Sequence, residues 1–263
     1  NIWKAEIHNS QYRPYLTVRS VNKIGRRHWM YCSKQKRQVH LLSDGERRAY
    51  TILLSMPETK AVMEQYALDI NETLDIADRR GVIHPRNYKT GEAHLMTTDF
   101  VVTQTISNQY GVQATAYTFK YFDQIYTMEG GNRQPKSHRT WEKFDIEREY
   151  WNLRGLDYRI ITERDATKEY AWNIQFCASA VNAVFTDNSI HSFLLLFKAN
   201  WLRKSTLTLQ EHMELVSKGL LISQEQSLEL FKFCVLRRLL SVEHDFCIRM
   251  FRPINLKIVN RGS

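Results

Sequence analysis

An acid, a threonine and a lysine occur at strand-like spacing in the middle of the sequence. Asp99 lies in one run of alternating apolar and polar residues, and Thr118 and Lys120 lie at the end of a second. A polar break that contains a glycine, residues 107–111, separates the two runs, which predicts a hairpin. The period of two places Thr118 and Lys120 on one face of the second strand and Phe119 on the other.

These residue types suit the hydrolysis of a phosphodiester bond. Hard ions such as Mg²⁺ prefer oxygen ligands, and Asp99, Glu46 and the backbone carbonyl of Phe119 can supply them. A bound ion polarises the scissile phosphate and makes hydroxide from water. Lys120 can orient the nucleophile and offset the charge that develops on the phosphate. We therefore expect a Mg²⁺ site, with Mn²⁺ as a substitute.

Glu46 has two interpretations. It lies in the first turn of a helix predicted over residues 44–56. Ser43 and Glu46 have the spacing of a capping box, which explains the acid by structure alone. The presence of Asp99 and Lys120 in the same sequence pattern favours a role for Glu46 as a metal ligand.

The net charge of +9 is unevenly distributed. Residues 1–50 carry +8, residues 51–165 carry −3 and residues 166–263 carry +4. A basic segment beside carboxylates suits the binding of DNA phosphates, which gives affinity without sequence preference. A solvated basic surface explains the charge equally well. The candidate phosphate contacts in the basic segment are Arg26, Arg27, Lys34, Lys36 and Arg37.

Composition and cysteine usage favour a cytoplasmic protein. A chain of 263 residues can hold one large or two small domains. Its sequence has no apolar run of about 18 residues, and its first residues lack the apolar core of a signal peptide. The four cysteines are scattered without a CxxC pair, which favours reduced thiols over disulfides or a zinc site. His84 and His94 have no partner at metal spacing, so we interpret them as loop histidines.

Periodicity predicts the elements that must position the acids and the lysine. Strands are expected at 15–21, 29–32, 38–41, 59–65 (with a bend) and 157–162, and helices at 68–80 and 137–153. The helix at 137–153 carries four acids, one of which could approach the site. This order of elements predicts an α/β domain with one mixed sheet and helices on its faces.

The pattern becomes helical after residue 167. Short helices, a helix over 224–240 and an alternating run at 254–259 resemble a winged-helix module. Helical packing without a binding role is an equally good interpretation. The predicted division is therefore 1–167, a basic arm with a catalytic domain, and 168–263, a winged-helix-like domain.

An acid on one strand and a residue-x-Lys triplet at the end of its neighbour resemble the site of the PD-(D/E)xK nucleases. The larger pattern resembles TnsA, the endonuclease subunit of heteromeric cut-and-paste transposases, over about residues 12–165. The matching stretches are, in order, 15–18, 39–46, 96–100, 118–120 and 142–151.

The resemblance implies a restriction-endonuclease-like fold and cleavage of the 5′, non-transferred strands at transposon ends. Its implied partners are double-stranded transposon-end DNA, a TnsB-like DDE transposase and a TnsC-like AAA+ ATPase that contacts the C-terminal domain. Relatives of this kind also occur in CRISPR-associated transposons. Glu46, Asp99 and Lys120 match the catalytic residues. Thr118 falls where the family commonly has Gln, and it could bind metal through its hydroxyl or a water.

Two other functions stay open. The neutral side chain of Thr118 favours a catalytically impaired DNA-binding or assembly subunit of the same machinery. A stand-alone restriction-like nuclease of the same fold would cut DNA without partner proteins.

Overall fold

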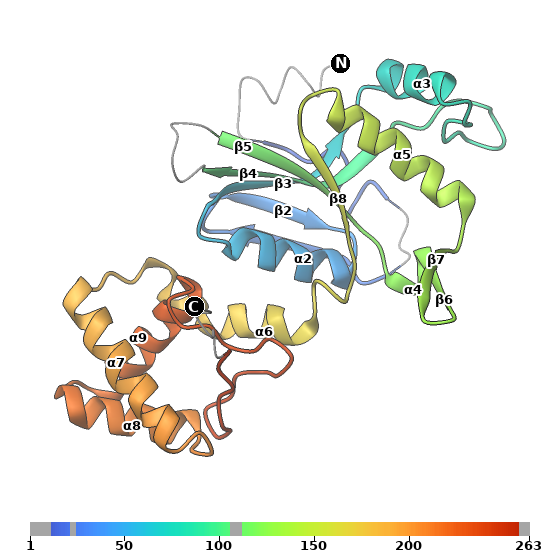
Figure 1. Ribbon diagram of the computed structural model, residues 1–263. Coiled ribbons are helices and arrows are strands. Elements are labelled where there is room, and N and C mark those ends of the chain that lie inside the picture. Colours follow the sequence, from blue (N-terminus) through green and yellow to red (C-terminus); the bar gives the residue numbers. More distant parts are fainter. Residues whose placement is uncertain (1–11, 22–24, 106–111, 258–263) are drawn as a thin grey trace. The chain divides into compact units, whose positions relative to one another are not determined.

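A computed structural model describes residues 12–21, 25–105 and 112–257 of the chain (Figure 1). The backbone separates into two compact units. The first comprises residues 1–54 and 58–166, and the second comprises residues 55–57 and 167–263. The predicted turn at 107–111 lies outside the described residues.

A four-stranded mixed sheet forms the centre of the first unit. Its strands, in spatial order, are β3 (Thr59–Ala67), β4 (Thr97–Thr105), β5 (Val112–Phe119) and β8 (Asp157–Ile161). Strand β4 is antiparallel to both β3 and β5, and β8 runs parallel to β5. The chain between β5 and β8 contains a helix, as a parallel connection requires. The predicted α/β domain with one mixed sheet is therefore confirmed.

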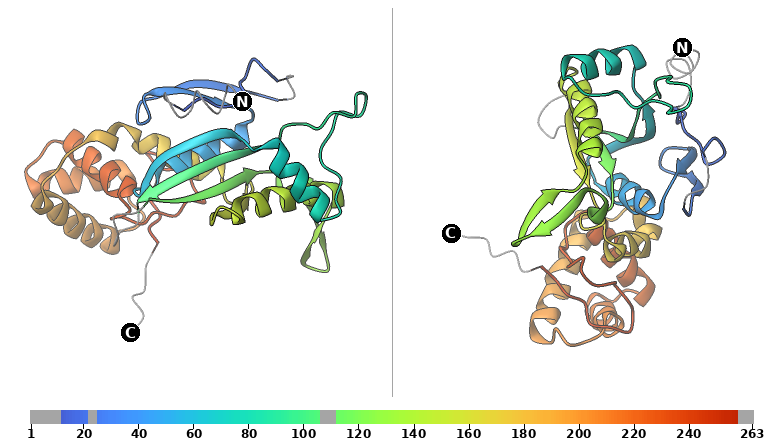
Figure 2. Two further views of the ribbon diagram at one scale, coloured as in Figure 1. Left: turned by 90° about the horizontal axis from the view of Figure 1, so that it is seen from above. Right: turned by 90° about the vertical axis from the view of Figure 1, so that its right-hand side faces the viewer.

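Helices cover both faces of this sheet (Figure 2). They are α2 (Asp44–Ser55), α3 (Ile70–Arg79) and α5 (His138–Asn152). Tyr50 of α2 contacts Phe100 on one face. On the other face Val101 joins a buried cluster with Ile76 of α3 and Ile146 of α5. The sheet is thus buried on both sides, which keeps water away from the strands that carry the candidate acid and lysine.

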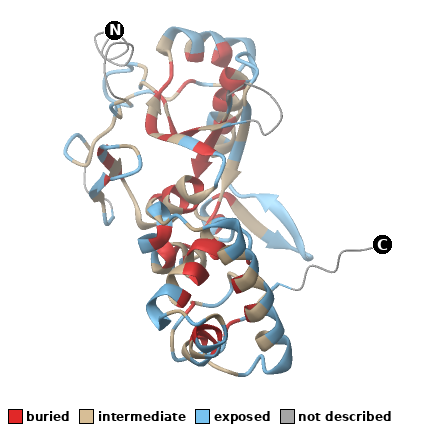
Figure 3. Ribbon diagram, turned by 90° about the vertical axis from the view of Figure 1, so that its left-hand side faces the viewer, coloured by how far each residue is buried: buried red, intermediate tan, exposed pale blue. Residues whose placement is uncertain are grey.

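Two hairpins extend the first unit. One consists of β1 (His28–Cys32) and β2 (Arg37–Leu41). The other consists of β6 (Tyr126–Glu129) and β7 (Asn132–Pro135), which follow the short helix α4 (Phe122–Ile125). Every residue of β7 is exposed, and the hairpin is drawn partly in pale blue and partly in tan in Figure 3, because the first half of β6 is of intermediate burial.

A buried ion pair attaches β2 to β3. The guanidinium of Arg37 contacts both carboxylate oxygens of Glu64, at 2.8 and 2.5 Å. It also donates to the carbonyl of Val62, and the backbone N–H of His40 donates to Glu64. Because both charges are buried and bonded to each other, removing either one would leave the other uncompensated. The pair fixes the strand that leads into α2.

The predicted strand at 15–21 is wrong. Its residues form turns, in which the N–H and hydroxyl of Ser20 both donate to the carbonyl of Thr17. The backbone N–H of Tyr15 donates to the carbonyl of Gln65 and attaches the segment to the sheet. Hydroxyl side chains that bond to nearby backbone compete with strand pairing, and periodicity does not register this competition.

The second unit is helical. Its elements are α6 (Lys168–Cys177), the 3₁₀ helix η1 (Ala178–Asn182), α7 (Asp187–Arg203), α8 (Leu209–Leu220) and α9 (Gln224–Leu236). Both α8 and α9 begin with a capping box, formed by Thr208 with Glu211 and by Ser223 with Gln226. Their apolar faces enclose Phe197 and Phe231 in one core. The helical C-terminal region is confirmed.

The expected closing strand at 254–259 is not formed over its described part, residues 254–257. Two isolated bridges, Thr208 with Pro253 and Val242 with Leu256, occur in this region instead. Residues 258 and 259 lie outside the described residues. A winged-helix character for the second unit stays a prediction. Among the described residues, no helix is both long and apolar enough to cross a membrane.

His212 is a destabilising feature of the second unit. It is fully buried, and neither ring nitrogen has a hydrogen-bond partner among the described residues. Burial lowers the pKa of His212 in the folded protein. The folded state therefore disfavours protonation of this ring. Its contribution to stability is complete above the pKa of the unfolded chain, about 6.5, and is lost as the pH falls. We expect His212→Leu to raise stability by about 1 kcal/mol at pH 7.5 and by more at pH 5.5, measured by thermal unfolding.

The matched control is His191→Leu, which changes an exposed histidine of the same unit. This substitution should leave the stability unchanged at both pH 7.5 and pH 5.5. A loss of stability in His212→Leu at both pH values would contradict the prediction, because it would mean that the imidazole is satisfied in solution.

Candidate active site

The structure brings the predicted acids to one place beside the lysine. Glu46 lies in the first turn of α2, Asp99 in β4, and Lys120 directly after β5. Glu46 and Asp99 are 8% and 9% exposed, so both are largely removed from water. The backbone N–H of Lys120 donates to the carbonyl of Ile161, which fixes its position beside β8.

One glutamine connects the two acids. The side-chain amide of Gln65 lies 3.2 Å from Glu46 Oε2 and 3.5 Å from Asp99 Oδ1. The other oxygen of Asp99 accepts from the N–H of Phe119 at 2.8 Å. Hydrogen bonds from neutral donors reduce the repulsion between the carboxylates without neutralising either. Gln65 was not among the residues singled out in the sequence, although a bend was expected in the strand that contains it.

Gln65 reaches this position through a left-handed backbone conformation. Its φ is +50°, although it lies inside β3. Its neighbours Glu64 and Tyr66 pair with β4 in regular register. A left-handed φ is unfavourable for a residue with a side chain, and strained residues of this kind concentrate at functional sites.

The structure confirms the cap at Glu46, and the role of Glu46 as a metal ligand stays a prediction. Ser43 Oγ accepts from the N–H of Glu46 at 3.0 Å, as expected for a cap. The Glu46 carboxylate accepts from the N–H of Leu42 at 2.8 Å and faces Gln65 with the same oxygen. The side chain therefore fastens the start of α2 and presents a carboxylate to Asp99.

A close helix approach makes this arrangement possible. A Cβ at Gly45 would lie 2.0 Å from the ring of Phe119, so only glycine fits there. Phe119 thus faces α2, whereas Thr118 faces α5 through its hydroxyl. The opposite orientation of these two residues confirms the expected alternation along β5.

A third acid enters from α5. Thr118 and Thr98 donate their hydroxyls to Glu147 Oε2, at 2.8 and 3.0 Å. Trp151 donates to the hydroxyl of Thr98. The sequence predicted that an acid of this helix could approach the site but did not identify which one. The signal was available in the helical period, because Glu147 lies beside the apolar stripe that includes Ile146 and Tyr150.

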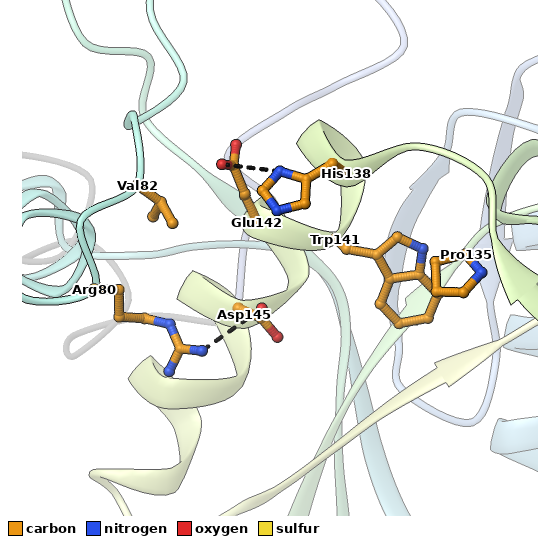
Figure 4. A pocket seen from close by; sticks show the side chains of 7 residues that line it. All are labelled: Arg80, Val82, Pro135, His138, Trp141, Glu142 and Asp145. Carbon is orange, nitrogen blue, oxygen red and sulfur yellow. Dashed lines mark ion pairs between the residues drawn. The ribbon is translucent and has the colours of Figure 1, made fainter.

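The other acids of α5 face outward. Glu142 pairs with His138, and Asp145 pairs with Arg80. These residues line a cavity of about 580 Å³ on the surface of the first unit (Figure 4). Because the acids in this cavity form ion pairs with neighbouring side chains, we assign no catalytic role to the cavity.

The electrostatics of the site follow from burial. Desolvation, followed by the charge of Asp99, raises the pKa of both Glu46 and Glu147 to about 7. Asp99, and then Glu147 and Glu46, raise the pKa of Lys120 against the opposing effect of burial. The lysine therefore stays charged and is the counter-charge for the carboxylates.

The candidate phosphate contacts of the basic segment differ in whether their side chains are free to meet DNA. Arg26 and Lys36 are exposed. Arg27 donates to the carbonyls of Val18 and Val21, and Lys34 donates to the carbonyl of Leu54. Arg37 is buried in its ion pair with Glu64, so we leave it out of the proposed DNA contacts.

The predicted loop histidines and free thiols agree with the structure. His84 is buried in a loop, where its ring nitrogens bond to the carbonyl of Pro85 and the hydroxyl of Thr73. The backbone N–H of His94 donates to the same carbonyl. All four cysteines are free.

The donor set fits a hard divalent ion. In the described part of the chain, no three His, Cys, Asp or Glu side chains are grouped to hold an ion by themselves. Mg²⁺ is usually bound by one or two carboxylates together with waters and substrate oxygens. The carboxylates of Glu46 and Asp99, next to the desolvated Glu147, meet that requirement.

A mixed sheet, an acid on the helix that precedes it, a central acid and a lysine at a strand end define the restriction-endonuclease-like class of nuclease domains. Comparison with known proteins finds a similar family. Residues 56–163, less than half of the chain, match the family model for the TnsA-like endonuclease N-terminal domain. This part of the chain is therefore similar to TnsA-type endonuclease domains.

One curated relative is the transposon Tn7 transposition protein TnsA of Escherichia coli. It is 29% identical over 172 residues, which cover 65% of this chain. The aligned region covers 58% of the length of that protein.

Glu147 makes stability depend on pH when metal is absent. Its pKa is raised from 4.5 to about 7 on folding, so the stability that its protonation provides is present below 4.5 and is lost as the pH rises through 7. In EDTA, we expect Glu147→Gln to be more stable than the wild type at pH 8, by up to about 3 kcal/mol, and nearly equal to it at pH 5.

Chemical denaturation at the two pH values measures this difference. Glu142→Gln, on the outer face of the same helix, is the control and should show no gain at pH 8. Equal stability of Glu147→Gln and wild type at pH 8 would show that Lys120 fully compensates the carboxylate.

The backbone of Gln65 can be tested separately from its amide. Gln65→Gly and Gln65→Ala both remove the amide, but only glycine adopts a φ of +50° without strain. We expect the glycine variant to be more stable than the alanine variant by about 1 kcal/mol in thermal unfolding. If alanine were the more stable, Gln65 would not hold this conformation in solution.

Proposed function

We propose that this chain is the endonuclease subunit of a Tn7-like cut-and-paste transposition system. It cuts the 5′, non-transferred strands at the ends of the transposon and so helps to excise the element. The observation that carries the proposal is the bridge from Gln65 to Glu46 and Asp99, because it holds two acids together beside Lys120. The TnsA-like domain at residues 56–163 supports it independently.

Mg²⁺ is the proposed cofactor, and Mn²⁺ is expected to substitute. Glu46, Asp99 and the carbonyl of Phe119 would hold the ion, and Thr118 would add its hydroxyl. When bound, the ion would polarise the scissile phosphate and acidify the attacking water.

The chain's own groups position and stabilise the reaction. Lys120 orients the water and offsets the charge that develops on the phosphate. The bond from the water oxygen to phosphorus forms, and the bond from phosphorus to O3′ breaks. The departing oxygen takes up a proton, which leaves a 3′-hydroxyl and a 5′-phosphate.

The neutral Thr118 is compatible with this activity. Its hydroxyl donates to Glu147, so a carboxylate from α5 lies beside the strand position at which the PD-(D/E)xK pattern has an acid. We propose that Glu147 supplies the missing negative charge. A catalytically impaired assembly subunit would need this third acid to be ineffective.

The proposed partners follow from the family. Transposon-end DNA would contact Arg26, Arg27, Lys34 and Lys36 through its phosphates. A TnsB-like DDE transposase would cut and join the 3′ ends, and a TnsC-like AAA+ ATPase would contact the second unit. The compartment of this reaction is the bacterial cytoplasm, at the nucleoid.

The decisive test is strand cleavage of transposon-end DNA in Mg²⁺, with the cognate TnsB-like transposase present. We expect the wild type to cut the 5′ strands and Asp99→Ala to lose at least about a hundredfold in rate while still binding DNA. Asp157→Ala changes an exposed acid of the same sheet and should cut normally.

The outcomes separate the candidate functions. Cuts at the 3′ ends alone, with wild type and variant alike, would show an assembly subunit with a dead site. Efficient 5′-strand cutting without the transposase would show a stand-alone nuclease. Normal cutting by Asp99→Ala would reject the active site described above.

A further inference from the structure

A groove lies on the first unit beside the β1–β2 hairpin. Its volume is about 660 Å³, within the range of small-ligand sites. The described residues that line it come from segment 12–17 and from the hairpin. Those that carry rings or polar groups into it include Tyr12, Arg13, Tyr31, Lys36, Gln38 and His40.

The hairpin presents an aromatic face to this side. Tyr31 lies opposite Gln38, and Trp29 lies opposite His40, so all four share one face of the hairpin. Trp29 stacks on His40 at 5.6 Å between ring centroids. Tyr31 and Trp29 are 57% and 51% exposed, although the inner face of the same hairpin is buried at Val39.

The charge of the groove has one sign. Arg13 and Lys36 are exposed, and no described Asp or Glu lines the groove. Glu64, which lies beneath, has both carboxylate oxygens bound to Arg37. The described surface therefore combines exposed rings with cations that have no described carboxylate beside them in the groove.

Lys36 occupies its position at a structural cost. It lies in the turn between β1 and β2 with a φ of +52°, where glycine would be favoured. The side chain that this backbone carries lines the groove and adds an exposed cation to it.

We propose that this groove binds an unpaired nucleotide of a DNA strand, with the base on Tyr31 and the phosphates on Arg13 and Lys36. Base faces in a duplex are covered by their neighbours, whereas exposed aromatic rings stack with unpaired bases of any sequence. The inference deepens the proposed function, on which it rests, because it assigns a single-stranded part of the DNA substrate to this chain.

Binding can be measured without cleavage. Fluorescence anisotropy in EDTA would compare a labelled 12-nucleotide oligothymidine with a duplex of equal length. We expect Tyr31→Ala to weaken single-strand binding roughly tenfold and duplex binding by less than about twofold. Tyr31→Phe, which keeps the ring, should bind as the wild type. Tyr88→Ala removes an exposed tyrosine elsewhere in the unit and is the control.

Lys36→Gly separates binding from folding. Glycine should raise the melting temperature by roughly 1–3 °C because it relieves the turn, yet single-strand binding should weaken. Equal losses on both DNAs, or none for Tyr31→Ala and Lys36→Gly, would overturn the proposal. Because the assay needs no metal, its failure is distinct from failure of 5′-strand cutting, which is scored separately with the wild type in Mg²⁺.

Discussion

Repulsion among buried carboxylates is the constraint on which the first unit depends. Glu46, Asp99 and Glu147 are all largely withdrawn from water, and Lys120 is the cation that opposes them. Desolvation alone would make such a group costly. The fold offsets this cost with fixed donors, among which the amide of Gln65 bridges two of the acids. A divalent cation bound as proposed would offset the negative charge that Lys120 leaves uncompensated.

Much of this could be predicted from sequence, since it depends on local pattern. Alternation located β4 and β5, and a capping signal located the start of α2. The same signal left Glu46 undecided, and the structure shows why: its carboxylate serves the cap and faces the site at once. One residue with two simultaneous roles cannot be assigned to either by spacing.

The residues that escaped prediction are those placed by distant contacts. Glu147 is distinguished from the other acids of its helix by Thr98 and Thr118, which belong to other strands. Gln65 depends on a backbone conformation that no periodicity encodes. The strand wrongly predicted at 15–21 fails because of local contacts. Its residues do alternate, but turns within the segment use hydrogen-bonding groups that a strand would need, such as the carbonyl of Thr17.

Gln65 and Lys36 share a left-handed backbone, and this has a consequence for protein engineering. A search that ranks variants by thermal tolerance alone would favour glycine at both positions. The first exchange would remove the bridge between the acids, and the second would remove a cation from the groove. Variants selected for thermal stability alone would thus lose side chains on which the proposed DNA binding and cleavage depend. A useful selection would have to score stability and activity together.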